Sequence, residues 1–315
     1  MKDGFGRKIN YLRISVTDLC SLRCIYCMPE HGISKICHTQ IMSVEDIEQA
    51  ARAAAAIGVE KIRITGGEPL VRRGIVDICR RVASVEGIRE LCITTNGVLL
   101  EKYAAELKDA GVSRLNISID TLDSEKYRRI TRVGDLETVL RGMEAAKKAG
   151  FTDTKLNVVL LGGINDDEIP AFCELTRNED IQVRFIELMP LGQCADWDRE
   201  RFITGSAVLT AVPDLKDEGI SGVARVYRLP GAKGTVGLIN PMSGHFCPGC
   251  DRIRLTADGK LKPCLHSDQE IDIRGLDYEA TLAAMKQAVL AKPDGHKMTD
   301  INPSDSHRNM NEIGG

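Results

Sequence analysis

The chain has 315 residues, 43% of them hydrophobic and 28% charged, with a formal net charge of -3. This length accommodates one large barrel or two ordinary domains, and the composition is that of a folded globular protein. The near-neutral charge excludes a protein that binds nucleic acid or an anionic membrane through a global basic field, although a local basic pocket for a small anion stays open.

Short strands alternate with amphipathic helices as far as about residue 190. The expected strands are Tyr11–Val16, Lys61–Thr65, Glu90–Thr95, Arg114–Ile119, Thr154–Leu160 and Gln182–Glu187. The expected helices are Val44–Ile57, Ile75–Ser84, Leu100–Asp109, Leu136–Lys148 and Asp167–Arg177. Ser43 with Asp46 predicts a capping box at the first helix, and Gly58, Gly111 and Gly150 predict helix ends.

This alternation predicts βαβ units on a parallel sheet, with functional groups at the carboxyl ends of the strands. Six units fit an incomplete (βα)6 TIM-like barrel better than a closed eight-fold one. After about Gly205 the pattern weakens, the sequence becomes rich in turn residues, and a second group of cysteines follows. We therefore expect an α/β fold with a partial barrel over residues 1–215 and a smaller, cluster-binding C-terminal domain over residues 216–315.

Cysteine usage carries the strongest chemical signal. The N-terminal segment has no apolar signal region, and the longest apolar stretch is short and interrupted by charge, so we expect a cytoplasmic protein with no membrane association. The chain has 11 cysteines. They are poor candidates for disulfides, because the cytosol keeps thiols reduced. Metal or redox chemistry is the better expectation.

The first cysteine set is Cys20, Cys24 and Cys27, a C-x3-C-x2-C motif directly after the first expected strand. Thiolates so close in sequence can converge on one iron–sulfur cluster from a loop wrapped around it. A cubane cluster has four irons, so three ligands leave one iron open, as in a catalytic metal site. A zinc knuckle and scattered core cysteines are the alternatives.

The stretch DLCSLRCIYCMPE, which contains this set, resembles the signature of the radical S-adenosylmethionine (SAM) superfamily. The resemblance implies a [4Fe-4S] cluster on the three cysteines, whose open iron is chelated by SAM. One electron from the cluster then cleaves SAM to a 5′-deoxyadenosyl radical. The resemblance also implies that Tyr26, between two ligands, approaches the adenine.

A second motif, TGGEP at residues 65–69, resembles the superfamily element that receives the amino group of SAM. Glycines let the backbone approach a ligand, and a carboxylate suits an ammonium partner, so Gly67 and Glu68 are expected to bind SAM. Thr94 and Ser118 lie at the ends of later strands, where polar groups of SAM are expected. Met189 would cover the adenine.

The second cysteine set is Cys247, Cys250 and Cys264, with C-x2-C-x13-C spacing. By spacing alone it is either a cluster site with an open iron or a zinc ribbon. A zinc ribbon needs a fourth ligand, which the flanking His245 or His266 could supply.

The segment FCPGCDRIRLTADGKLKPCL resembles the C-terminal cluster segment of the GTP 3′,8-cyclases of molybdenum-cofactor biosynthesis. The same family pattern covers nearly the whole chain in order, through YLRISVTDLC, KIRITGGEPLVRR, RLNISIDTL, KLNVVLLGGIND, RFIELMPLG and the terminal IGG. The resemblance implies a second [4Fe-4S] cluster, whose open iron binds the guanine. A triphosphate requires fixed cations, preferably arginines. The residues that resemble the family's GTP-binding positions are Arg13, Arg63, Thr94, Lys155, Arg184, Arg252 and Arg254.

By the same resemblance, the 5′-deoxyadenosyl radical abstracts hydrogen from ribose C3′ of GTP, and the carbon radical attacks guanine C8. An electron and a proton then complete the cyclised dihydro product, 3′,8-cyclo-7,8-dihydroguanosine 5′-triphosphate. The terminal Gly314 and Gly315 resemble a double glycine that reaches toward the active site. Implied partners are a flavodoxin- or ferredoxin-type electron donor, the downstream cyclic pyranopterin synthase accessory protein and a second copy of the chain.

Some positions depart from the family pattern. Asp251 stands where the family usually has Asn, which adds negative charge beside the proposed phosphate arginines. Cys37 and His38 match no family position, and with the other cysteines we expect them to be buried or incidental rather than ligands; those cysteines are Cys79, Cys92, Cys173 and Cys194. The rival functions are a peptide- or cofactor-modifying radical SAM enzyme and a non-catalytic electron-transfer or zinc protein.

Overall fold

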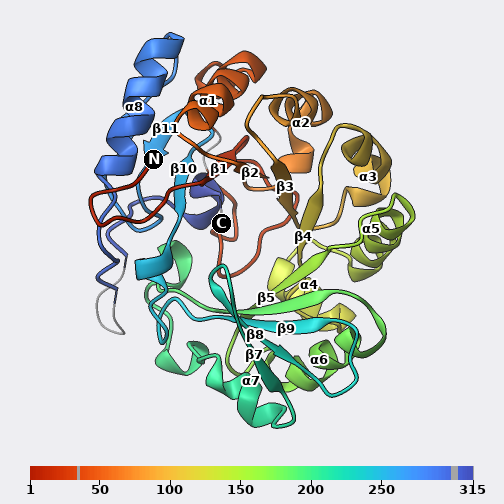
Figure 1. Ribbon diagram of the computed structural model, residues 1–315. Coiled ribbons are helices and arrows are strands. Elements are labelled where there is room, and N and C mark those ends of the chain that lie inside the picture. The colour runs from red at the N-terminus through yellow and green to blue at the C-terminus, as the bar shows by residue number, and fades with distance from the viewer. Residues whose placement is uncertain (34–35, 299–303, 315) are drawn as a thin grey trace.

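A curved sheet surrounded by helices forms the body of the protein in the computed structural model, which describes residues 1–33, 36–298 and 304–314 (Figure 1). The sheet has twelve strands in these ranges, in the order β12-β11-β10-β1-β2-β3-β4-β5-β6-β9-β8-β7. The run from β10 to β9 is parallel throughout. Its first six strands along the chain are β1 (Tyr11–Ser15), β2 (Lys61–Thr65), β3 (Glu90–Thr95), β4 (Arg114–Ser118), β5 (Lys155–Leu160) and β6 (Gln182–Glu187).

Helices cover the outer face of these strands (Figure 1). They are α1 (Val44–Ala56), α2 (Ile75–Ala83), α3 (Leu100–Asp109), α4 (Ser124–Thr131), α5 (Leu136–Lys148) and α6 (Ile169–Asn178). Every strand and helix expected from the sequence is present within two residues of its expected ends, so the prediction of an incomplete (βα)6 barrel is confirmed. The helix α4 was not predicted, because it is short and mostly polar and buries only Tyr127, Ile130 and Thr131.

The predicted helix boundaries are also confirmed. The Ser43 hydroxyl accepts a bond from the Asp46 backbone N–H, and the Asp46 carboxylate accepts one from the Ser43 N–H, which completes the capping box. Gly58, Gly111 and Gly150 have φ of 91°, 90° and 83° just after their helices, a conformation that side chains disfavour. No helix within the described ranges is both long and apolar enough to cross a membrane.

Strands after residue 215 extend both edges of the same sheet. On one edge, β9 (Thr235–Ile239) pairs with β6, and β8 (Ala224–Arg228) and β7 (Lys216–Ser221) follow. On the other, β10 (Arg252–Leu255) pairs with β1, followed by β11 (Lys260–Lys262) and β12 (Ile271–Asp272). The remaining helices are α7 (Ser206–Ala211), α8 (Tyr278–Leu290) and α9 (Met310–Ile313). The domain boundary at residue 215 stays a prediction, and the strands on its two sides share one sheet.

The period of two in the strands separates a packed face from a polar one. In β1, Leu12 and Ile14 are fully buried in the hydrophobic core, whereas the intervening Arg13 lines a cavity on the inner side of the sheet. The strands β2 and β10 repeat this alternation, with Arg63 and Arg254 on the inner side. The sheet therefore buries its apolar face under the helices and leaves a polar interior available for a ligand.

Candidate active site

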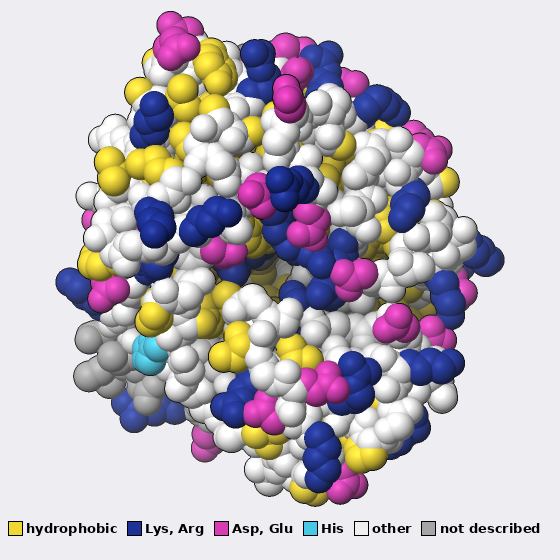
Figure 2. Space-filling view, viewed as in Figure 1, with side chains coloured by type: hydrophobic (Ala, Val, Ile, Leu, Met, Phe, Trp, Pro, Cys, Tyr) yellow, Lys and Arg dark blue, Asp and Glu magenta, His cyan; other side chains and the backbone are white. Residues whose placement is uncertain are grey.

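A cavity of about 550 Å³ occupies the inner side of the sheet. Figure 2 shows the hollow near the centre of the face in view, with Lys and Arg side chains gathered around it. All six cysteines of the two predicted sets line this cavity, together with every predicted SAM- and GTP-binding residue except Glu68. The tail residue Gly314 is buried next to Thr65 and Ser15, and Gly315 lies outside the described residues.

The first cysteine set lies in the loop that follows β1. Backbone bonds from the N–H groups of Cys27 and Met28 to the Cys24 carbonyl, at 2.9 and 3.2 Å, hold the loop in a tight turn. Burial raises the pKa of Cys20 to about 11 and that of Cys27 to about 12, with neighbouring thiols adding to the shift at Cys27. Buried thiolates of this kind need a nearby cation, so the donor set fits an iron–sulfur cluster.

The GGEP motif packs directly under this loop. The Gly67 N–H donates to the Thr17 carbonyl and the Glu68 N–H to the Leu19 carbonyl, both at 2.8 Å. The Glu68 carboxylate is fully buried and does not line the cavity. It accepts bonds from the Leu70 N–H, the Thr95 hydroxyl and the Asn96 N–H at 2.7–2.9 Å. Glu68 therefore ties the end of β2 to the end of β3, whereas its assignment to SAM binding stays a prediction.

Replacing Gly67 by alanine is expected to displace the first cysteine loop. A Cβ at this position would meet the Asp18 carbonyl oxygen at 2.6 Å and overlap the Leu19 carbonyl, and backbone atoms cannot rotate away. Overpacking of this kind costs about 1–3 kcal/mol, which thermal unfolding would measure, and iron content after reconstitution should fall. Gly4→Ala is the matched control, because its Cβ has nothing closer than 4.0 Å. Equal unfolding temperatures for the two variants would contradict this account.

Tyr26 has a partner that the sequence did not indicate. Its hydroxyl donates to the buried Asp120 carboxylate at 2.7 Å, and the other oxygen of Asp120 accepts the Val159 N–H at 2.9 Å. This chain of bonds fixes the ring of Tyr26 at the cavity wall beside Cys24 and Cys27. The contact of Tyr26 with the adenine of SAM stays a prediction.

The predicted basic residues converge because of strand register. Arg254, Arg13 and Arg63 are direct register partners on β10, β1 and β2, and paired residues of parallel strands point to the same face. Arg252 lies two residues before Arg254, so both face the cavity, as expected. Arg13 and Arg63 lie in the middle of their strands, and Arg252 and Arg254 lie within β10, whereas the first cysteine set follows the carboxyl end of β1. The expectation that functional groups gather at the carboxyl ends thus holds for the first cysteine set and for Gly67, Thr94, Ser118 and Met189, but not for the arginines.

The positive charges of this cluster lie close together, which lowers the pKa of some of its members. Burial first, and then the neighbouring Arg252, lowers the pKa of Arg254 to about 10. Burial and then Arg63 lower the pKa of Arg184 to about 10. Like charges held together at a cost in free energy are typical of an anion-binding site. Lys61, Arg114 and Tyr11 also line the cavity; each lies two residues before a cavity-facing position of its strand, so the strand period identifies them.

The affinity for GTP is expected to fall as pH rises through 8. Burial and the neighbouring Arg184 lower the pKa of Lys155 to about 8, so the ammonium that would attract phosphate is present below this pH and lost above it. One such group predicts about a tenfold weaker affinity at pH 9 than at pH 7, measurable by anaerobic equilibrium dialysis. Lys155→Arg should flatten the profile, because guanidinium stays protonated.

A second group titrates in the same range and serves as the control. Although burial raises it, the pKa of Tyr11 is lowered to about 8 by Arg63, Arg13 and Arg252, and its phenolate would also repel phosphate. Tyr11→Phe with native Lys155 should retain most of the pH dependence. If Tyr11→Phe flattens the profile and Lys155→Arg does not, the assignment to Lys155 is wrong.

The second cysteine set is braced from two sides. The Arg7 guanidinium donates to the Cys247 carbonyl at 2.9 Å, and the buried Lys292 ammonium donates to the carbonyls of Arg252 and Pro263 at 2.8 and 3.1 Å. These bonds hold both ends of the segment that carries Cys250 and Cys264. The thiols of Cys247, Cys250 and Cys264 line the same cavity. A cubane has each cysteine on a different iron, so the donor set fits a cluster.

The histidines near the second cysteine set, and the residues that depart from the family pattern, have defined positions in the structure. His266 and His296 line the cavity, and burial lowers the pKa of His266 to about 3. The Asp251 carboxylate lies 3.5 Å from the Arg252 guanidinium. The Cys194 thiol donates to the Met189 carbonyl at 3.1 Å and so supports that cavity wall. Cys37 is exposed, while the thiols of Cys79, Cys92, Cys173 and Cys194 are buried.

The end of the chain reaches the site. The Arg254 guanidinium donates to the carbonyls of Gly314 and Ile313 at 2.6 and 3.3 Å. A Cβ at Gly314 would overlap the Thr65 hydroxyl, so only glycine fits between the tail and β2.

Comparison with known structures identifies the fold. The chain superposes on Streptococcus suis SuiB bound to S-adenosylmethionine with a TM-score of 0.58 at 16% identity, over 84% of this chain and 63% of that one. It superposes on anSMEcpe with bound AdoMet with a TM-score of 0.57 at 16% identity, over 86% and 80% of the two chains. Both share the barrel.

Comparison of sequences is more specific. The pattern of the Radical SAM superfamily matches residues 14–176, and that of Molybdenum Cofactor Synthesis C matches residues 181–298. The GTP 3′,8-cyclase of Alkaliphilus oremlandii is 49% identical over 100% of both chains. That of Peptoclostridium acidaminophilum is 52% identical over 99% of this chain and 98% of its own. The chain therefore belongs to the GTP 3′,8-cyclase family of radical SAM enzymes.

Proposed function

We propose that this protein converts GTP into 3′,8-cyclo-7,8-dihydroguanosine 5′-triphosphate, the first step of molybdenum-cofactor biosynthesis. One observation carries the proposal: two three-cysteine sets and a buried basic cluster line the same cavity. A radical enzyme that acts on a nucleoside triphosphate needs both features, a cluster to start the chemistry and fixed cations for the phosphates.

Two [4Fe-4S] clusters and SAM complete the proposed site. The first cluster, with SAM, follows from family membership and supplies the one-electron cleavage that starts radical chemistry. Gly67, Ser118, Met189 and the ring of Tyr26 would contact SAM. The second cluster would be held by Cys247, Cys250 and Cys264, with its open iron toward guanine.

The residues of the chain position the substrate and keep water from it. Arginines on β1, β2, β6 and β10, with Thr94 and Lys155, would bind the triphosphate and leave the ribose between the cysteine sets. In the proposed reaction a hydrogen atom leaves C3′, a bond forms between C3′ and C8, and one electron and one proton reach N7, so the product is an isomer of GTP. Enclosure within the barrel limits quenching of the carbon radical by solvent.

The proposal also covers the partners of the protein and its location in the cell. A flavodoxin- or ferredoxin-type protein would deliver both electrons, and the cyclic pyranopterin synthase accessory protein would consume the product. We expect a cytoplasmic homodimer.

The test uses anaerobic, reconstituted protein with dithionite, SAM and GTP carrying deuterium at C3′, followed by mass spectrometry. We expect deuterium in 5′-deoxyadenosine and, in step, a cyclised product with the mass of unlabelled GTP, because the deuterium lost from C3′ is replaced by a proton at N7. ATP is the control, with the same phosphates and a different base. 5′-Deoxyadenosine without consumption of GTP would overturn the substrate assignment. Protein that retains zinc and cleaves no SAM would overturn the enzyme class as well.

A further inference from the structure

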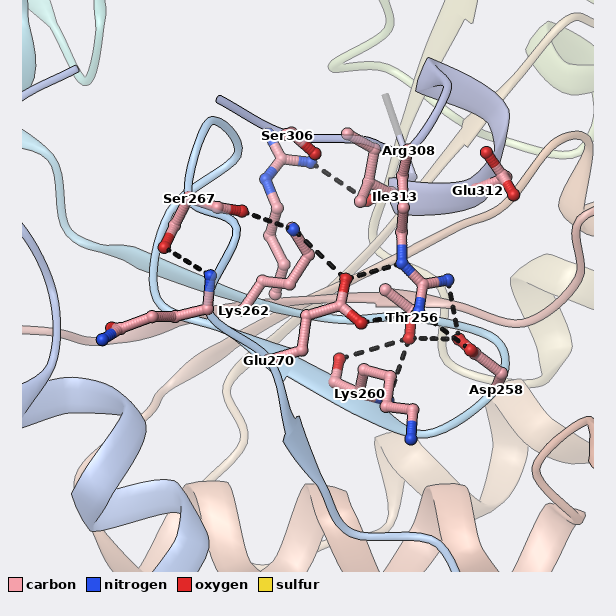
Figure 3. A network of polar contacts seen from close by, with 12 residues as sticks. Thr256, Asp258, Lys260, Lys262, Ser267, Glu270, Ser306, Arg308, Glu312 and Ile313 are labelled. Atoms are coloured by element: carbon pink, nitrogen blue, oxygen red, sulfur yellow. Dashed lines mark hydrogen bonds and ion pairs between the residues drawn. The ribbon is translucent and has the colours of Figure 1, made fainter. Parts of the chain in front are cut away.

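A network of charged side chains surrounds Arg308, six residues before Gly314 (Figure 3). Its guanidinium bonds both oxygens of Glu270, at 2.6 and 2.7 Å, and both oxygens of Asp258, at 3.1 and 2.9 Å. Two bidentate pairs on one guanidinium are a strong and orientation-specific contact. The side chain of Arg308 is only 18% exposed, so solvent screens these bonds weakly.

The two carboxylates belong to the segment that carries the second cysteine set. Asp258 lies in the turn between β10 and β11, where the Thr256 hydroxyl donates to it at 2.6 Å. Glu270 directly precedes β12 and accepts the buried Lys262 ammonium at 3.3 Å. Figure 3 shows Arg308 reaching down from the terminal segment onto both of them. The partners of Arg308 are therefore fixed by the sheet.

The segment after Arg308 contacts the first cysteine loop and also Arg254, which belongs to the segment that carries the second cysteine set. Asn309 and Glu312 cap α9. The Asn311 amide donates to the Asp18 carbonyl in the first cysteine loop at 3.3 Å, and its backbone N–H contacts the Cys27 thiol. Two residues further on, the carbonyls of Ile313 and Gly314 receive the Arg254 guanidinium. One short segment thus spans the distance between the first set and the phosphate arginines.

A helix of four residues has no stability of its own. Its position therefore depends on side-chain anchors. Among the described residues of the terminal segment, 304–314, Arg308 makes the ion pairs. The other side-chain bonds from this segment to the rest of the molecule are single and neutral, such as that of Ser304 with His266 at 3.0 Å and that of Asn311 with the Asp18 carbonyl at 3.3 Å.

We propose that Arg308 is a positioning residue that docks the terminal segment onto Asp258 and Glu270 and so holds its carbonyls against Arg254 between the two cysteine sets. This inference rests on the proposed function for its catalytic consequence, but not for the docking itself. With the segment docked, Arg254 keeps a fixed orientation toward the substrate phosphates and the cavity stays closed to water. If the segment were not docked, SAM would still be cleaved, but a smaller fraction of the cleavage events would lead to cyclised product.

The experiment compares Arg308→Gln and Arg308→Lys with the native full-length protein. Hydrogen exchange, measured by mass spectrometry on reconstituted protein without GTP, reports docking independently of the reaction. We expect Arg308→Gln to raise exchange in residues 304–314 at least tenfold and to leave β1–β6 unchanged, with Arg308→Lys intermediate. Arg141→Gln is the matched control, because it removes an exposed ion pair with Glu101 elsewhere. Unchanged exchange in residues 304–314 of a folded Arg308→Gln protein would overturn the proposal.

A second readout separates positioning from general damage. In Arg308→Gln we expect cyclised product to fall at least tenfold and more than 5′-deoxyadenosine, so that their ratio drops. Deleting residues 314–315 should lower the same ratio, and the double variant should be no worse than the deletion alone, because both act through the same contact. Additive losses would overturn the proposal. If native protein forms no cyclised product, the proposed function fails while the exchange result still decides the docking.

Discussion

Cys24→Ala is expected to abolish reductive cleavage of SAM and to remove half of the iron. Cys24 lines the cavity from the first cysteine loop, and burial together with neighbouring Asp120 raises the pKa of its thiol well above the ordinary value. Only a bound cation makes such a thiolate stable. Two ligands do not hold a cubane, so iron should drop from about eight to about four atoms per chain. Iron analysis and the yield of 5′-deoxyadenosine are the measurements.

Cys250→Ala is the matched variant, because it removes one ligand of the other set. The same iron loss is expected, but SAM cleavage should persist at no less than about a tenth of the native yield, with no cyclised nucleotide, since the first site lies at the opposite end of the strands. Electron paramagnetic resonance of the reduced variants should show a different remaining cluster in each. If Cys250→Ala keeps all of its iron, the second cluster does not exist.

Arg252→Ala is expected to weaken GTP binding about 100-fold. The Arg252 guanidinium lies over the Tyr11 ring with its carbon 5.2 Å from the centroid. Among the described residues, its buried Nε atom has no hydrogen-bond partner, although the Asp251 carboxylate lies 3.5 Å away. A fixed charged donor of this kind is worth about 1.5–3 kcal/mol toward a charged acceptor. The dissociation constant, measured by calorimetry on reconstituted protein, is the test, with iron content as the check that the cluster is intact.

Two further variants bracket this result. Asp251→Asn should tighten GTP binding by a few-fold, because the carboxylate 3.5 Å from Arg252 offsets part of its charge. Arg225→Ala, which removes an arginine that is 60% exposed on β8, should change the affinity less than two-fold. Weakening in Asp251→Asn, or equal losses in Arg252→Ala and Arg225→Ala, would mean that Arg252 does not contact the triphosphate.

The alternation of strands and helices could be predicted from the sequence because it depends on local patterns of residues. Apolar residues with a period of two mark each parallel strand, and caps such as Ser43 and Gly58 mark the helix ends. The helix α4 was not predicted, because its eight mostly polar residues show too weak a helical period of apolar residues. The strands β7–β12 were not predicted for a related reason. Their segments are short, and their positions in the sheet depend on partners far away in the chain.

The chemistry at the first cysteine set was also local, since Cys20, Cys24 and Cys27 must reach one cluster from a single loop. The position of Glu68 was not. A carboxylate in the GGEP motif suits an ammonium ligand, yet tertiary contacts take up its two oxygens with Thr95, Asn96 and Leu70. Nothing in the residues around Glu68 indicates which end of β3 will lie beside it.

The sequence by itself determined the barrel class, the two cysteine sets and the identity of the cations, because spacing and side-chain chemistry act over a few residues. Only the tertiary structure decided which of these groups meet. Register between β10, β1 and β2 brings Arg254, Arg13 and Arg63 onto one face. Packing of the terminal segment on Asp258 and Glu270 brings Gly314 to Arg254. Both depend on contacts between residues 38 or more positions apart in the chain, and such contacts leave no period or motif in the sequence.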